Sequence, residues 1–456
     1  MPSKSASPQN LVEGSIKQAL IRMTLPMIIG MLMLFTFSLV DTFFISLLGT
    51  VPLTAISFTF PVTFTIMSLA IGLGIGASAV VGKFLGSSQI EKAKQAATVI
   101  LYLSLAIAAV IALLIYLAMD HLFVLMGASD ELLVPISQYM DVWMPASVMV
   151  VCMMAGNSVL RACGDTKTPS LLMAMAGFFN ALLDPLLIFG PGPFPELGIA
   201  GAAWATVIAW AIAFVILIYV LVVRLEMVSR SIPSRAVMRT SGREMLRIGI
   251  PAAGANMMTP LAAGIMTAIA ASFGGTAVAA FGVGARIEPI ATLIVLAMSS
   301  SLPPLISQNY GAGRMDRVEE AYRLGIRFIM AWQLAVYLLL AVSAGLIASL
   351  FSDDPEVIRA ISLFVWIMPL GYGLQGIIIL SNSALNALHQ PLAALYLSIA
   401  RFFVFYVPLA WLGSQIFGLA GFFAGAVAGN LCMAAISWRR FKQALAEHAP
   451  VPEAVS

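Results

Sequence analysis

Long apolar segments recur along almost the whole chain, and they constrain the fold more than any other feature of the sequence. Each is long enough, at about 20 residues or more, for an α-helix to cross the hydrocarbon core of a bilayer. Only 10% of the 456 residues are charged, against about 25% in soluble proteins, so much of the surface is expected to face lipid. The predicted spans are residues 16–48, 52–81, 93–119, 132–160, 169–190, 198–224, 243–273, 276–306, 318–351, 356–388, 391–412 and 418–438.

The distribution of charge between the spans supports this count and predicts an orientation. Almost all of the 24 Lys and Arg residues lie before the first span or after the second, fourth, sixth, eighth and twelfth. Acidic residues such as Asp130, Glu131 and Asp353 lie in the alternate loops. Because basic loops remain cytoplasmic, we expect a multi-pass protein of the cell (inner or plasma) membrane with both termini in the cytoplasm.

The second half of the chain repeats markers of the first at an offset of 225 residues. Arg22-x-x-x-Pro26 falls on Arg247-x-x-x-Pro251, Gly86 on Gly311, and Asn157 on Asn382; at an offset of 220, Gly198 falls on Gly418. A parallel repeat of two six-helix units is typical of secondary transporters that rock two lobes around a central site. The predicted organisation is a tail at 1–15, an N-lobe at 16–224, a linker at 225–242, a C-lobe at 243–445 and a tail at 446–456.

Several kinds of protein are disfavoured by what the sequence contains. A phosphate-binding GxxxxGK[ST] loop is missing, and Gly72-x-Gly74-x-Gly76 lies inside an apolar span, where it indicates close helix packing. With three His residues and no nucleophile–base or metal constellation, an enzyme is not expected. We expect no cofactor, no nucleic-acid partner and a monomer in contact with membrane lipid.

Ionisable residues within the spans need an explanation, because each costs at least ~2.5–3.5 kcal/mol at the centre of a bilayer. Asp41 lies in the first span and Asp184 in the fifth, at similar depths, and Asn180 precedes Asp184 by one helical turn. Thr206 in the sixth span lies in the same layer. These oxygen ligands suit a proton or Na⁺, and no other metal site is predicted.

Two carboxyl groups that share a poorly solvated pocket disfavour each other's ionisation, so the pair could hold a proton near neutral pH. The alternative is structural: each Asp caps a kink or bonds a neighbouring helix. The second repeat lacks this chemistry, since Asp41 falls on Met266 and Asp184-Pro185 on Val407-Pro408.

Other polar residues within the spans are candidates for a substrate cavity or for pairing between helices. Arg401 could pair with Glu288, and a structural role is favoured over a substrate role for these two and for Arg286. Asp141 either lines a cavity or lies near the membrane interface. The candidate cavity residues are Tyr139, Asp141, Asn157, Asn256 and Asn382.

The sequence resembles the multidrug and toxic compound extrusion (MATE) family over nearly its whole length. The motifs that carry the resemblance are Pro26 with Val40-Asp41-Thr42, Gly82-Lys-Phe-Leu-Gly86, Arg161-Ala-Cys-Gly-Asp-Thr-Lys-Thr-Pro169 and Asn180-x-x-x-Asp184-Pro185. It looks most similar to the prokaryotic DinF-like branch, in which the acidic N-lobe site carries the coupling cation. The resemblance assigns that site to Asp41, Asn180, Asp184 and Thr206, with Ala202 lining it through its backbone.

The resemblance implies an all-α membrane protein with twelve helices in two lobes. It further implies an efflux antiporter that exports cationic or amphiphilic compounds, driven by inward H⁺ or Na⁺. Protonation of Asp41 and Asp184 would bend the first helix and expel the substrate. The alternative is a flippase for a lipid-linked precursor, which would need a basic cavity that only Arg286 and Arg401 could supply.

Overall fold

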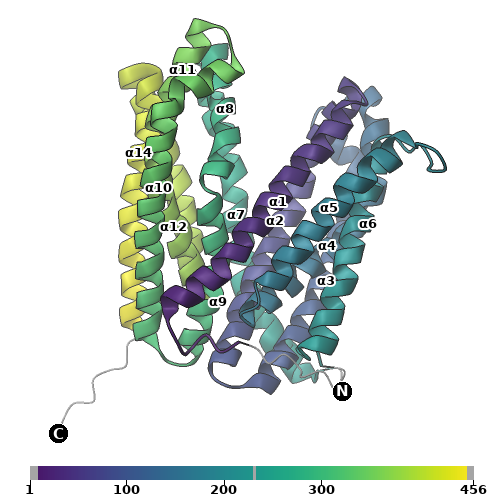
Figure 1. The fold of residues 1–456 in the computed structure, drawn as a ribbon, viewed down its shortest axis with the longest axis vertical. Helices are drawn as coiled ribbons and strands as arrows, with labels where there is room; N and C mark the ends of the chain where they lie inside the picture. The colour runs from purple at the N-terminus through teal and green to yellow at the C-terminus, as the bar shows by residue number, and fades with distance from the viewer. Residues whose placement is uncertain (1–8, 230–232, 449–456) are drawn as a thin grey trace. The chain divides into compact units, whose positions relative to one another are not determined.

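The protein is all α-helical in a computed structural model that describes residues 9–229 and 233–448. The remaining parts of the predicted tails and linker, at 1–8, 230–232 and 449–456, lie outside the described residues. The first half of the chain (Figure 1) contains α1 (Ile16–Ser46), α2 (Thr50–Gly86), α3 (Ile90–Leu125), α4 (Asp130–Ala162), α5 (Lys167–Phe189), α6 (Ile199–Tyr219) and the π-helix η1 (Val220–Arg224). The second half contains α7 (Arg235–Ala271), α8 (Gly275–Ala291), α9 (Leu293–Gly311), α10 (Met315–Phe351), α11 (Pro355–Ile367), α12 (Leu370–Ala387), α13 (Pro391–Ile399), the π-helix η2 (Ala400–Tyr406) and α14 (Val407–Glu447).

Twelve membrane spans are present among these helices, as predicted. In the described part of the chain, nine helical stretches are long and apolar enough to cross a membrane, and the bent pairs α8–α9 and α11–α12 each make one further span. The stretch Pro391–Glu447 contains two spans, because Phe417 and Gly418 leave the helical conformation in the middle of α14.

Two spans that were predicted to be continuous are sharply bent. The axes of α11 and α12 differ by 47° at Pro369, which has no N–H to donate to the preceding turn. The axes of α8 and α9 differ by 44° at Thr292, three residues after Pro289. The Thr292 hydroxyl and backbone nitrogen both donate to the Glu288 carbonyl oxygen, at 2.7 and 2.9 Å, at the bend.

The described helices group into two compact units. One contains Leu25–Ala253 and the segment that ends at Leu11, and the other contains Val12–Thr24 with the chain from Gly254 onward. The start of α1 is therefore part of the second unit, where the Thr24 and Ser301 hydroxyls share a hydrogen bond of 2.7 Å. Likewise, the start of α7 is part of the first unit. The second unit thus contains the first turns of α1, and the first unit contains the first turns of α7.

The backbone shows the repeat at positions that the residue types alone do not reveal. Left-handed φ angles occur at Gly49 and Gly274 (110° and 95°), and at Ser88 and Gly313 (60° and 71°). They also occur at Gly164 and His389 (79° and 59°). Each pair is 225 residues apart. At the offset of 220, Gly198 (φ 56°, ψ −132°) matches Gly418 (φ 59°, ψ −141°), a conformation that is essentially restricted to glycine. The duplication therefore extends to the turns between helices.

The glycines of the second span pack tightly against neighbouring helices, which confirms their predicted role. A Cβ at Gly74 would lie 2.6 Å from the Ser158 hydroxyl of α4. A Cβ at Gly72 would lie 2.6 Å from the Ala253 nitrogen of α7. The α2–α4 pair forms the main interface of the first unit, because small residues let helix backbones approach closely.

We expect Gly72→Leu to destabilise the first unit strongly, because its side chain would meet the α7 backbone rather than a flexible side chain. Overpacking of this kind costs about 1–3 kcal/mol of unfolding free energy or more. Thermal unfolding of the purified protein in detergent measures the effect. Gly264→Ala in α7 is the control, since nothing lies within 4 Å of a Cβ at that position. Equal melting temperatures for the two variants would contradict the packing described here.

Candidate functional site

The predicted acidic site forms inside the first unit, between α5 and α6. The Asp184 side chain is completely buried. Its Oδ1 accepts a hydrogen bond from Asn180 Nδ2 at 3.2 Å, and the same amide nitrogen lies 3.1 Å from Thr206 Oγ1. One carboxamide therefore links the carboxyl group of α5 to the hydroxyl of α6.

A tight hairpin holds α5 and α6 in this register. The backbone nitrogens of Leu197 and Gly198 donate to the carbonyl oxygens of Leu187 and Ile188 at 3.0 and 3.1 Å. Gly201 packs directly against the Leu187 carbonyl group, where a Cβ would not fit. Asp184, one turn further from the hairpin, is thereby brought to the level of Thr206.

Asp41 of α1 completes the site from a third helix. Its side chain lies within hydrogen-bonding reach of the Asp184 carboxyl group. Both Asp41 and Asp184 lie five residues before the last residue of their helices, about 7.5 Å along the axis. Two carboxyl groups can share a hydrogen bond only when one of them carries a proton, so this contact suits a bound proton.

Without such a proton, each of these two carboxyl groups has a buried oxygen with no hydrogen-bond donor among the described residues. These atoms are Asp41 Oδ1 and Asp184 Oδ2. A buried polar atom that lacks a partner is costly, and such atoms concentrate at functional sites. Their chemistry, together with the hydroxyl of Thr206, also fits Na⁺, a hard cation that takes oxygen ligands.

An apolar cluster adjoins the acidic site on the side nearer the ends of α1 and α5. Ile45, Ile188 and Ala202 form its buried centre, with Tyr139 and Phe44 among the side chains packed against it. Ala202 thus belongs to this apolar cluster, and the expected lining of the site by its backbone stays a prediction. Tyr139, predicted as a cavity residue, lies near both Asp41 and Asp184. Since an isolated Tyr in α4 has no distinctive spacing, its link to the acidic pair was not predicted from sequence.

The other candidate cavity residues lie on α4, α7 and α12. Asp141 is exposed on α4. Asn157 is fully buried, and neither amide atom has a partner among the described residues. Asn382, its counterpart in the repeat, donates to Ser398 Oγ at 3.0 Å, and Asn256 of α7 is half-buried. Their grouping into one substrate cavity stays a prediction.

The predicted pair of Arg401 and Glu288 is replaced by contacts with amides. In the described structure, Arg401 Nε donates to Asn430 Oδ1 at 3.1 Å, and its guanidinium group lies 4.7 Å from the centre of the Phe402 ring. Glu288 Oε1 accepts a hydrogen bond from Gln375 at 2.8 Å. Spacing along one helix cannot identify such partners, although amides in predicted spans could have suggested them. The two charges still attract each other at longer range.

Comparison with known proteins tests the predicted relationship. The MatE family matches residues 26–186 and 251–412 of this chain. The two matched segments start 225 residues apart, at the offset of the internal repeat, and together cover more than half of the sequence.

The chain belongs to the MatE family.

Relatives with known names show how widely the family varies in cargo. The chain is 41% identical over 423 residues to the FAD transporter of Shewanella oneidensis, covering 93% of this chain and 94% of that protein. It is 27% identical over 412 residues to the multidrug export protein MepA of Staphylococcus haemolyticus, covering 90% and 89%. The bent form of the MATE transporter VcmN of Vibrio cholerae superposes with a TM-score of 0.91 at 34% identity, covering 95% and 98%.

These relationships establish several points about this MatE chain. It is a multi-pass membrane protein with the twelve-helix, two-lobe MATE fold. It is a secondary transporter rather than an enzyme. Among the described residues, no group of three or more His, Cys, Asp or Glu side chains could hold a metal ion.

Proposed function

We propose that this MatE protein exports FAD, or a closely related flavin dinucleotide, in exchange for protons that enter through the Asp41–Asp184 site. The observation that carries the substrate is the 41% identity to an FAD transporter over 93% of the chain. Identity to the multidrug exporter MepA is only 26–27% over similar lengths. The cargo proposed here therefore differs from the cationic compounds expected from sequence.

The position of Arg286 supports an anionic cargo. Arg286 lies in α8, eleven residues after Gly275, or about 16 Å into a membrane span. It is exposed in the second unit and has no salt bridge or hydrogen bond within the described part of the chain. Because an arginine that faces lipid at this depth is costly, we place it on a water-filled pathway. There its planar guanidinium group can bind a diphosphate through two hydrogen bonds.

The acidic site supplies the coupling in this proposal. With a proton shared between Asp41 and Asp184, α1 is bonded to α5 and the pair carries one negative charge instead of two. After the proton leaves, two like charges within one pocket repel each other and favour separation of α1 from α5.

We place both termini in the cytoplasm of a cell whose inner membrane holds the protein, following the positive-inside rule. We also assign the chain to the DinF-like branch.

Proteoliposomes that contain FAD test this function directly. We expect FAD to leave the vesicles when protons are supplied outside, and Arg286→Gln to raise the KM for FAD roughly tenfold or more, since a hydrogen bond to a charged group contributes about 1.5–3 kcal/mol. Arg359→Gln, which removes an exposed arginine from α11 of the same unit, should leave KM unchanged. Export of a cationic dye without any export of FAD would contradict the proposal.

Export of cationic drugs is the second candidate, favoured by the similarity to MepA. In that case the deprotonated carboxyl pair would attract the cargo itself, and protons would compete with it. Arg286→Gln should then leave transport unchanged or improve it, because the arginine would repel a cationic substrate.

A further inference from the structure

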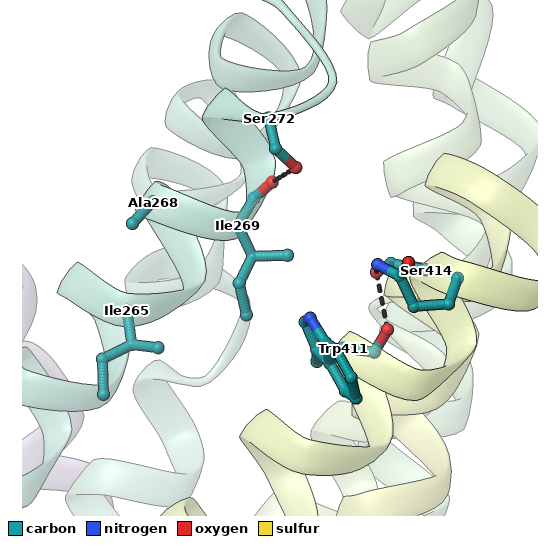
Figure 2. Close-up of a pocket in the computed structure, with 7 residues that line it drawn as sticks. Ile265, Ala268, Ile269, Ser272, Trp411 and Ser414 are labelled. Carbon is teal, nitrogen blue, oxygen red and sulfur yellow. Dashed lines mark hydrogen bonds between the residues drawn. The ribbon is translucent and has the colours of Figure 1, made fainter.

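A cavity of about 310 Å³ lies in the second unit, between the last turns of α7 and the start of α14. The residues that form it include Ile265, Ile269, Ser272, Trp411, Ser414 and Gln415. Figure 2 shows the Ile269 side chain pointing from α7 toward the Trp411 ring of α14 across this space. Half of the Trp411 surface is exposed, so the indole is available for contact.

The repeat relates two residues of the first unit to this region. At the offset of 225, Ile45 falls on Ala270; at the offset of 223, at which Asp184 falls on Val407, Ile188 falls on Trp411. In the first unit, Ile45 and Ile188 meet in the buried cluster beside the acidic site. In the second unit, Ala270 is buried in a separate apolar cluster and does not line the cavity, whereas half of the Trp411 surface is exposed beside it. The first unit thus packs two buried isoleucines where the second unit has a buried alanine and a half-exposed tryptophan.

The walls of the cavity combine a flat aromatic surface with hydrogen-bonding groups. Gln415 follows Trp411 by four residues and lies on the same helix face. Its Nε2 donates to Ser414 Oγ at 3.3 Å, and Ser414 Oγ donates to the Trp411 carbonyl oxygen at 2.6 Å. A carboxamide has two N–H donors and a carbonyl acceptor, so Gln415 can bond a further partner while it keeps the contact with Ser414.

This combination suits a planar ring that has donors and acceptors along one edge. Small-molecule sites have volumes of about 300–1,000 Å³, so a cavity of about 310 Å³ can take one ring system but not a whole dinucleotide. The isoalloxazine ring of a flavin has a flat face for Trp411 and alternating C=O and N–H groups for Gln415. We propose that the cavity between α7 and α14 binds the isoalloxazine ring of the exported flavin. This inference rests on the proposed function.

Binding of riboflavin, FAD and ADP to the purified full-length protein in nanodiscs tests the proposal. Riboflavin contains the ring without phosphates, and ADP contains the diphosphate without the ring. Stacking on an aromatic side chain contributes enough that Trp411→Ala should weaken riboflavin binding roughly 5- to 150-fold, while ADP binding stays the same. Trp411→Phe, which keeps a flat ring, should restore most of the affinity. Trp438→Ala, an exposed tryptophan of the same helix, is the matched control.

The outcomes separate this inference from the proposed function. If the wild-type protein binds and exports FAD but Trp411→Ala binds riboflavin as tightly as wild type, the cavity is not the ring site. If the wild-type protein neither binds nor exports any flavin, the proposed function fails first. Photolabelling with an azidoflavin gives a second readout: modification of residues 265–272 or 411–415 supports the proposal. Labelling elsewhere, with a phospholipid retained at Trp411, would assign the cavity to lipid and overturn it.

Discussion

Asp184→Asn is expected to reduce proton-driven export by at least about tenfold while the protein remains folded. Asparagine keeps the size of the side chain and its contact with Asn180, but it has no proton to exchange with Asp41. Because the Asp184 side chain is completely buried, no water can take over the role of the lost partner without a rearrangement. Hydrogen bonds that involve charged groups contribute about 1.5–3 kcal/mol, or roughly 10- to 150-fold in rate.

Initial rates of FAD export under an imposed pH gradient, normalised to the amount of protein, measure this effect. Glu131→Gln makes the same chemical change at an exposed position in the first turn of α4 and should export at the wild-type rate. Thermal unfolding separates a transport defect from a folding defect. A folded Asp184→Asn protein that exports at the wild-type rate would show that the pair is structural.

A membrane potential alone is expected to drive export if the cargo is FAD. The diphosphate of FAD carries two negative charges, so its exit in exchange for one entering proton moves three charges in the same electrical direction. Each charge contributes about 2.3 kcal/mol per 100 mV, which amounts to about 7 kcal/mol for the cycle. In contrast, exchange of a monovalent cation for one proton moves no net charge.

Vesicles with a potassium gradient and valinomycin distinguish the two cases without any pH gradient. Making the FAD-containing side negative should accelerate FAD export, and reversing the potential should suppress it. A monovalent cationic dye in the same vesicles is the control, since its exchange for one proton should be insensitive to the potential. An FAD flux that does not respond to valinomycin would rule out this stoichiometry and the dianionic cargo.

The spans and the repeat could be predicted because both depend on local patterns. Apolar runs of membrane length identify helices whatever their neighbours, and markers such as Pro26 and Pro251 recur at a constant offset. The turns proved to repeat as well, since Ser88 and Gly313 share a left-handed φ although their residue types differ. The bends at Thr292 and Pro369 were not predicted. Proline permits a bend, but tertiary packing decides whether it occurs.

The acidic site was accessible to sequence reasoning because intramembrane carboxyl groups are rare and helix geometry relates depth to residue number. Asn180 and Asp184 are one turn apart on one helix, and the hairpin between α5 and α6 aligns Thr206 with them. The partners of Arg401 and Glu288 belong to other helices, so no spacing along the chain identifies them. The cavity beside Trp411 depends on how the side chains of α7 and α14 pack, which no residue pattern predicts.

Proton movement evoked by the substrate is the most direct measurement of the central claim, that the Asp41–Asp184 pair couples protons to export. Proteoliposomes with an internal pH dye would receive FAD with and without Na⁺. We expect FAD to drive proton movement in the wild-type protein at the same rate in both conditions, and to drive none in Asp184→Asn. Proton movement that requires Na⁺, or that persists unchanged in Asp184→Asn, would contradict the account.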